Sequence, residues 1–233
     1  MAHKVLIIED ELNIRRYLQL SLKNSGYAVL VAETGEDGFK IAEWERPQIV
    51  LLDVGLPGVD GFTVCKMLRS ANPEIGIILL TAKSLMSDKS EGFAAGADDY
   101  CVKPCDVREL KMRIDALIRR MGLELGEAKL QQISQGSYVM NLRAHEFFNE
   151  GQLVKLSPTE FALLQLFLEN VGRAFTREEL LNRIWGLDYE GDPKVVDVYI
   201  RRLRVKIERP NGYNPIGTIW GKGYRFDNEA EVL

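Results

Sequence analysis

The sequence predicts an α/β domain with a doubly wound, five-stranded parallel sheet, followed by a smaller α+β domain that contains a helix-turn-helix. Three observations support this prediction. In the first half, short apolar runs alternate with amphipathic stretches, as in chains that form parallel sheets. Near residue 121 this alternation gives way to short strands and strongly capped helices. The length of 233 residues fits two domains of ordinary size.

The first half contains five strand-and-helix units. Strands are expected at 4–10, 27–32, 48–53, 75–81 and 99–103, and helices at 12–25, 35–44, 62–69, 86–95 and 107–120. Gly26 follows the first helix, where glycine supplies the left-handed conformation that commonly ends a helix. Right-handed crossovers place the helices of such a domain on both faces of the sheet.

Polar side chains end four of the predicted strands. Asp53 closes the third strand, and Glu9 and Asp10 close the first. Thr81 closes the fourth strand and Lys103 the fifth. Because the carboxyl ends of parallel strands converge on one crevice, these side chains are expected to meet there. An acid pair, a hydroxyl and a lysine around Asp53 indicate a Mg²⁺-dependent carboxylate that accepts a phosphoryl group.

Three carboxylates in a small volume repel one another unless a cation or a proton intervenes. Mg²⁺ suits such a site, because it takes oxygen ligands from one or two carboxylates, a carbonyl and a phosphate. Gly55, two residues after Asp53, is positioned to offer that carbonyl. The alternative is that Asp10 caps the helix that begins at Glu11.

Three further residues have both a functional and a purely structural interpretation. Lys103 precedes Pro104, which restricts it to an extended backbone. Its ammonium could pair with Asp53 and then hold a phosphoryl oxygen, or it could simply be a surface lysine. The Thr81 hydroxyl could donate to a phosphoryl oxygen, or Thr81 could merely finish a strand. Tyr100 is most simply a strand aromatic that packs on a helix.

Residues 1–120 resemble the receiver domain of bacterial two-component response regulators, which has a flavodoxin-like fold. The resemblance implies that Asp53 accepts a phosphoryl group from a sensor histidine kinase, assisted by Thr81 and Lys103. It also implies Mg²⁺ at Asp10, Asp53 and the Gly55 carbonyl, with Glu9 acting through water, and a switch pair of Thr81 and Tyr100. The matching residues are Glu9-Asp10, Asp53, Leu56-Pro57-Gly58, Asp60-Gly61, Thr81-Ala82, Gly96-Ala97-Asp98-Asp99-Tyr100 and Lys103-Pro104.

The same resemblance implies a homodimer on phosphorylation, formed through a surface from about Ser87 to Arg119. Family members pair the positions of Lys89 with Glu109 and of Asp99 with Arg113 across the two-fold axis, and all four residues are present. A third acid–base pair would fall on Ala94 and Asp115 and is absent. Exposed pairs contribute only about 0–1 kcal/mol each, so this loss weakens the expectation without removing it.

The cysteines are few and odd in number: Cys65, Cys101 and Cys105. No C-x-x-C spacing occurs, which disfavours a disulfide framework and a zinc site and fits a reducing cytoplasm. Cys105 stands where relatives usually have phenylalanine after Lys-Pro. We interpret Cys101 and Cys105 as small buried hydrophobic residues rather than redox sensors.

A linker is expected at 121–129 and a second domain at 130–233. Several short strands are predicted between 130 and 155, including a hairpin that turns at Asn149-Glu150-Gly151. Ser157 and Thr176 each begin a capping box, with glutamate three residues on, and so start helices. The first of these helices is expected to reach Gly172, and Asp192-Pro193 starts a third helix.

The third helix carries a positive charge that the overall net charge of −4 hides. Residues 194–225 contain eight basic and two acidic residues, a balance of +6, so the remainder of the chain carries −10. Val196, Ile200, Leu203 and Ile207 recur at helical spacing and form the inward stripe. A basic outer face on a helix that follows a helix-turn-helix suits the DNA major groove. A merely solvated basic face is the alternative.

Residues 130–226 resemble the winged-helix DNA-binding domain of OmpR/PhoB-class response regulators. The motifs are LSPTEFALLQLF, REELLNRIW, VVDVYIRRLRVKI and GKGYRF. The resemblance implies a wing from about Thr218 to Arg225. Trp220 stands where relatives often have arginine. Lys222 would then supply the charge instead, and Trp220 would pack on sugar or on the helix. The implied DNA contacts are Lys194, Tyr199, Arg201, Arg202, Arg204, Thr218, Trp220 and Lys222.

The sequence therefore predicts a cytoplasmic transcription regulator switched by phosphorylation of Asp53. Its expected partners are a sensor histidine kinase, promoter DNA with tandem half-sites, RNA polymerase and a second copy of the chain, with no membrane. It is not expected to be an enzyme beyond assisting its own phosphorylation and dephosphorylation. One rival is an aspartyl-phosphate phosphohydrolase, disfavoured because Gly55 stands where a general acid would be needed. The other is a winged helix that binds protein. Stimulus, kinase, target genes and the sign of regulation are not encoded in a recognisable form.

Overall fold

The computed structural model describes residues 2–82, 92–93, 95–122, 132–187, 189, 193–209 and 212–227. The chain divides into two compact units, Met1–Ile118 and Arg119–Leu233. The predicted helix at 86–95 lies almost entirely outside the described residues, as do Lys89, Ala94 and positions 123–129 of the predicted linker. Within the described residues, no helix is long and apolar enough to cross a membrane.

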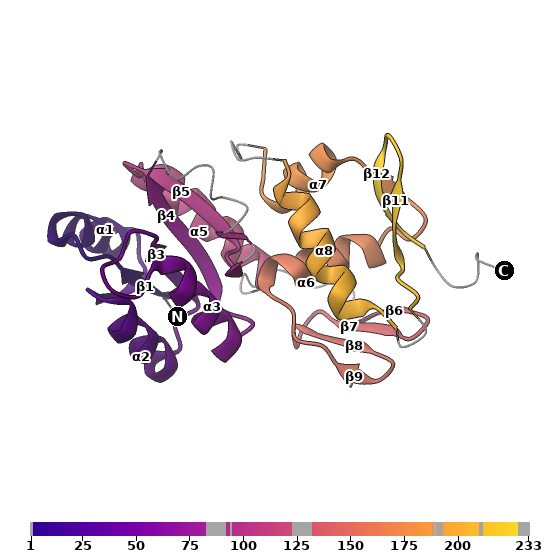
Figure 1. Cartoon of the computed structure of the whole chain (residues 1–233), viewed down its shortest axis with the longest axis horizontal. Helices are drawn as coiled ribbons and strands as arrows, with labels where there is room; N and C mark the ends of the chain where they lie inside the picture. Colours follow the sequence, from indigo (N-terminus) through magenta and orange to yellow (C-terminus); the bar gives the residue numbers. More distant parts are fainter. Residues whose placement is uncertain are drawn as a thin grey trace. The chain divides into compact units, whose positions relative to one another are not determined.

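The first unit contains the predicted five-stranded parallel sheet (Figure 1). The strand order is β2-β1-β3-β4-β5. The apolar runs of β1, β3 and β4 are almost completely buried, as expected for strands covered on both faces. The strands are β1 (Lys4–Ile8), β2 (Ala28–Ala32), β3 (Ile49–Asp53), β4 (Gly76–Ala82) and β5 (Asp99–Lys103).

Four described helices surround this sheet: α1 (Leu12–Asn24), α2 (Gly35–Glu45), α3 (Gly61–Ala71) and α5 (Val107–Arg120). Thr34 caps α2 and Asp60 caps α3, and each side chain accepts a hydrogen bond from the backbone N–H three residues later. In contrast, Glu11 occupies the N-cap position of α1 and no side chain caps that helix. Asp10 is therefore not a helix cap, and the structural alternative for this acid is wrong.

The second unit opens with a four-stranded antiparallel sheet, β6 (Gln132–Gln135), β7 (Tyr138–Asn141), β8 (Glu146–Asn149) and β9 (Gln152–Leu153). The predicted hairpin joins β8 to β9. Glu150 and Gly151 at its turn have φ values of 51° and 76°, as a two-residue hairpin with left-handed residues requires.

Among the described residues, three helices and a second sheet complete this unit (Figure 1). The helices are α6 (Pro158–Leu168), α7 (Arg177–Ile184) and α8 (Val195–Ile207). The strands β10 (Ala174–Phe175), β11 (Ile216–Ile219) and β12 (Gly223–Phe226) form an antiparallel sheet in the order β10-β12-β11. Both predicted capping boxes are present, at Ser157 and at Thr176. Helix α6 ends at Leu168, earlier than the predicted Gly172.

Candidate functional site

Asp53 ends the central strand β3, and Lys103 ends β5, two strands away in the same sheet. The Lys103 Nζ lies 2.9 Å from Asp53 Oδ2 and 2.8 Å from Glu9 Oε2. The Lys103 side chain is only 18% exposed, so it is not the surface lysine of the alternative interpretation. Strand topology thus brings together three charged groups that are distant in sequence, as predicted.

The acidic cluster consists of Glu9, Asp10 and Asp53, whose ligand oxygens all lie within 4.8 Å of one another. Burial raises the pKa of Glu9, and the nearby Asp53 raises it further, while Lys103 opposes the shift. Burial would lower the pKa of Lys103, but its hydrogen bonds to Glu9 and Asp53 raise it overall. The cluster sets three carboxylates against one ammonium group, so Lys103 does not offset all of the negative charge. A donor set of hard carboxylate oxygens with excess negative charge fits a divalent cation such as Mg²⁺.

Two glycines shape the backbone around Asp53. The Gly55 N–H donates a hydrogen bond to Asp53 Oδ1 at 3.1 Å. Gly61 lies so close to the end of β3 that a Cβ there would be 2.2 Å from the Asp53 carbonyl oxygen. The start of α3 is thereby held directly against the strand that presents the acceptor carboxylate.

Arg15 on α1 is a site residue that the sequence did not reveal. Its Nη1 donates to the carbonyl oxygens of Glu9 at 2.6 Å and Asp10 at 2.9 Å. This contact fixes the segment that carries both acids. No sequence signal distinguishes Arg15 from Arg16 beside it, because a helical arginine near the surface is common.

The expected switch residues lie on neighbouring strands and are both buried. Thr81 Oγ1 donates to the carbonyl of Ala82 at 3.3 Å. The Tyr100 ring packs edge-on against Phe93, with ring centroids 5.6 Å apart. Tyr100 is therefore the buried strand aromatic of the structural interpretation, in an inward position that is also compatible with the switch role.

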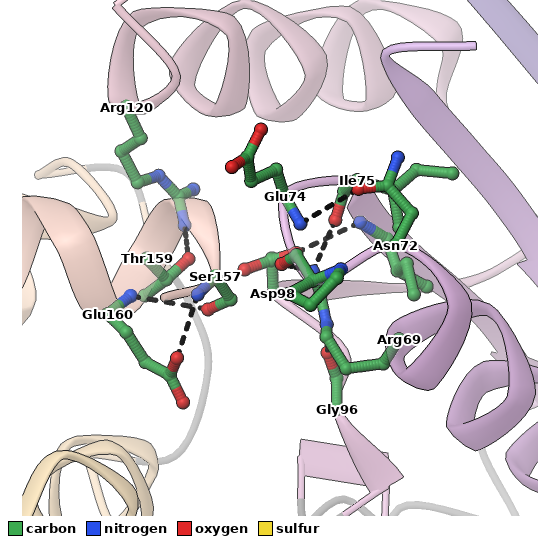
Figure 2. A network of polar contacts seen from close by, with 12 residues as sticks. Arg69, Asn72, Glu74, Ile75, Gly96, Asp98, Arg120, Ser157, Thr159 and Glu160 are labelled. Carbon is green, nitrogen blue, oxygen red and sulfur yellow. Dashed lines mark hydrogen bonds and ion pairs between the residues drawn. The ribbon is translucent and has the colours of Figure 1, made fainter. Parts of the chain in front are cut away.

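Asp98, in the Gly96–Tyr100 motif, anchors the first unit through a buried ion pair with Arg69 of α3 (Figure 2). Arg69 Nη2 donates to Asp98 Oδ2 at 2.5 Å, and its other nitrogens donate to the carbonyls of Pro73, Ile75 and Gly96. Asp98 Oδ2 also accepts from the Ile77 N–H at 3.0 Å. The pair ties α3 to the beginnings of β4 and β5, which deliver Thr81 and Lys103.

Three of the four residues expected at a dimer interface, Asp99, Glu109 and Arg113, pair within one chain. Arg113 Nη1 lies 3.0 Å from Asp99, and its Nη2 lies 2.7 Å from Glu109. Burial opposes protonation of Arg113, but these two carboxylates raise its pKa overall. Asp115 is likewise occupied, by Lys111 at 2.7 Å and by the Tyr27 hydroxyl. Ion pairs between two copies of the chain across a two-fold axis would have to replace these intrachain ion pairs.

Helix α8 exposes part of the predicted DNA-binding set, but it buries Tyr199. Lys194 and Arg201 are exposed. Tyr199 has 0% of its surface exposed and packs against Trp185, with ring centroids 5.4 Å apart. The prediction that Tyr199 contacts DNA is therefore corrected: it belongs to the core stripe with Val196, Ile200 and Leu203.

Glu160 of α6 is a buried acid that holds two basic residues of α8. It is 0% exposed, with Lys206 Nζ 2.6 Å from Oε2 and Arg202 Nε 3.4 Å from Oε1. The same side chain closes the capping box by accepting from the Ser157 N–H at 2.8 Å (Figure 2). Arg202, expected to contact DNA, is thus held on the protein side of α8.

The wing is the β11–β12 hairpin, and Arg204 ties it to α8. Arg204 Nε donates to the Ile216 carbonyl at 3.0 Å, and Nη2 donates to Thr218 Oγ1 at 2.8 Å. At the hairpin turn Lys222 is exposed and Trp220 is 92% exposed. Packing of Trp220 on the helix, one of two interpretations from sequence, is therefore wrong. The Trp220 ring is therefore accessible to a ligand.

Asp197 on α8 connects three elements of the second unit. Its Oδ1 accepts from Arg177 Nε at the start of α7 and from the Tyr224 hydroxyl on β12, both at 2.7 Å. Helix α8 is therefore fixed to the preceding helix α7 and to the β11–β12 hairpin by one carboxylate. A rigid mutual arrangement of helix and wing is what docking against a duplex requires.

Comparisons with known families match each unit separately. Residues 5–115 match the response regulator receiver domain, and residues 151–226 match the C-terminal domain of transcriptional regulatory proteins. These matches follow the observed division of the chain into a parallel-sheet unit and a helix-and-wing unit.

Similar proteins cover almost the whole chain. The transcriptional regulatory protein AfsQ1 of Streptomyces coelicolor is 42% identical, over 96% of this chain and 97% of its own. The alkaline phosphatase synthesis transcriptional regulatory protein PhoP of Bacillus subtilis is 40% identical, over 97% of this chain and 98% of its own. Among solved structures, the response regulator DrrB, a Thermotoga maritima OmpR/PhoB homologue, is 34% identical with a TM-score of 0.51, over 98% of this chain and all of its own.

Proposed function

This chain belongs to the two-component response regulators that join a receiver domain to an OmpR/PhoB-type DNA-binding domain, and we propose that phosphorylation of Asp53 controls its binding to promoter DNA. Such a chain is a transcriptional regulator whose two domains imply a histidine kinase partner and DNA binding. The observation that carries the proposal is the Lys103 ammonium, 2.9 Å from Asp53 and 2.8 Å from Glu9.

The phosphoryl group would pass from a phosphohistidine of the kinase to Asp53. An Asp53 carboxylate oxygen attacks phosphorus, the phosphorus–nitrogen bond breaks, and the imidazole leaves. Phosphoryl transfer is catalysed mainly by positioning and by neutralisation of charge. Lys103 would hold a phosphoryl oxygen, and the Thr81 hydroxyl would donate to another. Mg²⁺ held by Asp10, Asp53 and the Gly55 carbonyl, with Glu9 acting through water, would neutralise further charge.

We infer that the receiver acts on its own acyl phosphate only and is not a turnover enzyme. The neutral Gly55 stands two residues after Asp53, where an aspartyl phosphohydrolase would need a general acid. Steady release of phosphate from small phosphate esters would instead support the phosphohydrolase rival.

Signal output would come from dimerisation in the cytoplasm. Phosphorylation would favour a receiver pair in which Asp99 and Glu109 exchange their intrachain Arg113 for partners on the second copy. Two winged helices would then occupy tandem half-sites, and joining two modest sites raises the apparent affinity through effective concentration. RNA polymerase would be the partner recruited at the promoter.

A gel-shift titration tests the proposal. Genomic fragments would be titrated with the full chain, with and without acetyl phosphate and Mg²⁺. We expect a specific shift at lower protein concentration when both are present. Equal binding with and without the phosphodonor would contradict the switch, and no shift with any fragment would favour the protein-interaction rival.

A further inference from the structure

Three residues, Glu9, Asp10 and Glu11, link β1 to α1, and the first two carry acids of the receiver cluster. At the start of this link, the Glu9 N–H donates a hydrogen bond to the Ala32 carbonyl at 3.2 Å. At its end, Glu11 occupies the N-cap position of α1, and no side-chain hydrogen bond caps this helix. The backbone between these two points therefore lacks the side-chain bond that commonly fixes the entry into a helix.

Arg15 holds this link from within the helix. Its Nη1 donates to the Glu9 carbonyl at 2.6 Å and to the Asp10 carbonyl at 2.9 Å. Its Nη2 lies 3.2 Å from the Glu33 carboxylate, and the Arg15 side chain is only 11% exposed. One guanidinium nitrogen therefore bridges two successive carbonyls, and a charged donor forms stronger hydrogen bonds than a neutral one.

The two acids of the link differ in how their side chains are held. Lys103 Nζ holds the Glu9 carboxylate, at 2.8 Å from Oε2 and 3.0 Å from Oε1. Among the residues that the structure describes, by contrast, none donates a hydrogen bond to the Asp10 carboxylate. The direction of the Asp10 side chain therefore depends on its own backbone, which Arg15 holds.

We propose that Arg15 is a positioning residue of the Mg²⁺ site, which raises the affinity for Mg²⁺ by fixing the backbone that aims the Asp10 carboxylate. This role rests on the proposed Mg²⁺ site at Asp10, Asp53 and Gly55. Mg²⁺ demands nearly octahedral geometry with ligand oxygens at about 2.0–2.1 Å, so a small shift of one ligand weakens binding. Loss of a group that orients a metal ligand typically costs about 10- to 100-fold in metal affinity.

The charge of Arg15 acts in the opposite direction from its hydrogen bonds. A guanidinium beside the segment that carries the acids repels a divalent cation, so electrostatics alone predicts that removing Arg15 strengthens Mg²⁺ binding. The positioning role predicts that removing it weakens Mg²⁺ binding. The sign of the change in affinity therefore separates the two roles.

The test is a Mg²⁺ titration of the full chain at constant ionic strength, without a phosphodonor, followed by amide shifts in two-dimensional NMR spectra. We expect Arg15→Gln to raise the Mg²⁺ dissociation constant about tenfold. Arg15→Lys keeps the charge and one donor nitrogen on a shorter side chain, so its dissociation constant should lie between those of the parent and Arg15→Gln. Arg16→Gln is the matched control, because it removes the same charge from an exposed position on the same helix, and its Mg²⁺ binding should not weaken.

Amide shifts away from the acidic cluster should match those of the parent, which shows that each variant is folded. Labelling from radioactive acetyl phosphate should need about tenfold more Mg²⁺ for its half-maximal rate in Arg15→Gln and approach the parent rate at saturating Mg²⁺.

Equal or tighter Mg²⁺ binding by Arg15→Gln would overturn the proposal, and so would equal weakening in Arg16→Gln. Should Arg15→Gln not fold, Arg15→Lys decides, and a dissociation constant equal to that of the parent would then overturn the proposal. If the parent protein failed to label at all, the proposed phosphoryl acceptor would be wrong, while the Mg²⁺ titration would still decide the role of Arg15.

Discussion

Replacing Glu160 by glutamine should destabilise the DNA-binding unit far more than the same replacement at a matched surface position. Glutamine is accepted at the third position of a capping box, so the bond from the Ser157 N–H can persist. What is lost is the negative charge between Lys206 and Arg202, at 2.6 Å and 3.4 Å. The new amide NH₂ would also face one of these donors.

The magnitude follows from the burial of the three groups. Removing one partner from a fully buried ion pair costs about 3–5 kcal/mol. Glu160 is fully buried, but the Arg202 and Lys206 side chains are 20% and 31% exposed and can recover some hydration. We therefore expect Glu160→Gln to lower the free energy of unfolding of this unit by about 2–3 kcal/mol.

Urea unfolding of the full chain, followed by tryptophan fluorescence, measures this loss. Trp185 is buried in the second unit, whereas Trp44 and Trp220 are largely exposed, so the main spectral change reports unfolding around Trp185. Glu179→Gln is the matched control, because Glu179 occupies the same position in the exposed capping box of α7. Its midpoint should stay close to the parent value. Equal midpoints for both variants would refute the role assigned to Glu160.

Three further predictions concern other sites. Gly61→Ala would place a Cβ 2.2 Å from the Asp53 carbonyl oxygen, so it should cost about 1–3 kcal/mol and slow acetyl phosphate labelling; unchanged stability and labelling would contradict this close approach. Burial lowers the pKa of His145 from 6.5 to about 4, so the folded chain binds fewer protons than the unfolded chain below pH 6.5, and stability is lost as pH falls. Between pH 7 and 5 this loss should be about 2 kcal/mol in urea titrations. This pH dependence should vanish in His145→Asn, because the titrating imidazole is removed. Asparagine is chosen because it tolerates the φ of 56° at this position. Lys222→Ala should reduce the salt dependence of DNA binding by about one phosphate contact. Trp220→Ala should weaken DNA binding without changing the stability of the chain. If neither variant weakens DNA binding, the wing assignment is wrong.

The sequence was sufficient for the receiver site because strand topology carries the prediction. Apolar runs that end in Asp53, Thr81 and Lys103 must deliver those groups to one edge of a parallel sheet. The contact of Lys103 with Glu9 in addition to Asp53 is a matter of side-chain reach, which the pattern does not specify. The role of Arg15 could not be predicted, because its hydrogen bonds go to backbone carbonyls and no local sequence motif marks such contacts.

The DNA-binding face was harder to predict because two signals conflicted. Helical spacing places Tyr199 beside Val196, Ile200 and Leu203, and burial follows that spacing. The family resemblance instead suggested a DNA contact there. The pairing of Arg202 with Glu160 joins residues from two helices, and the sequence contains no information on which basic side chain turns toward a buried acid.

The most direct test of phosphorylation at Asp53 compares the labelling of the Asp53→Asn variant with that of the Asp60→Asn variant. Both variants replace one carboxylate by an amide, and asparagine can still cap α3 at position 60. Incubated with radioactive acetyl phosphate and Mg²⁺, the parent and Asp60→Asn should acquire label and gain promoter affinity, and Asp53→Asn should do neither. Parental labelling and promoter binding by Asp53→Asn would contradict the account.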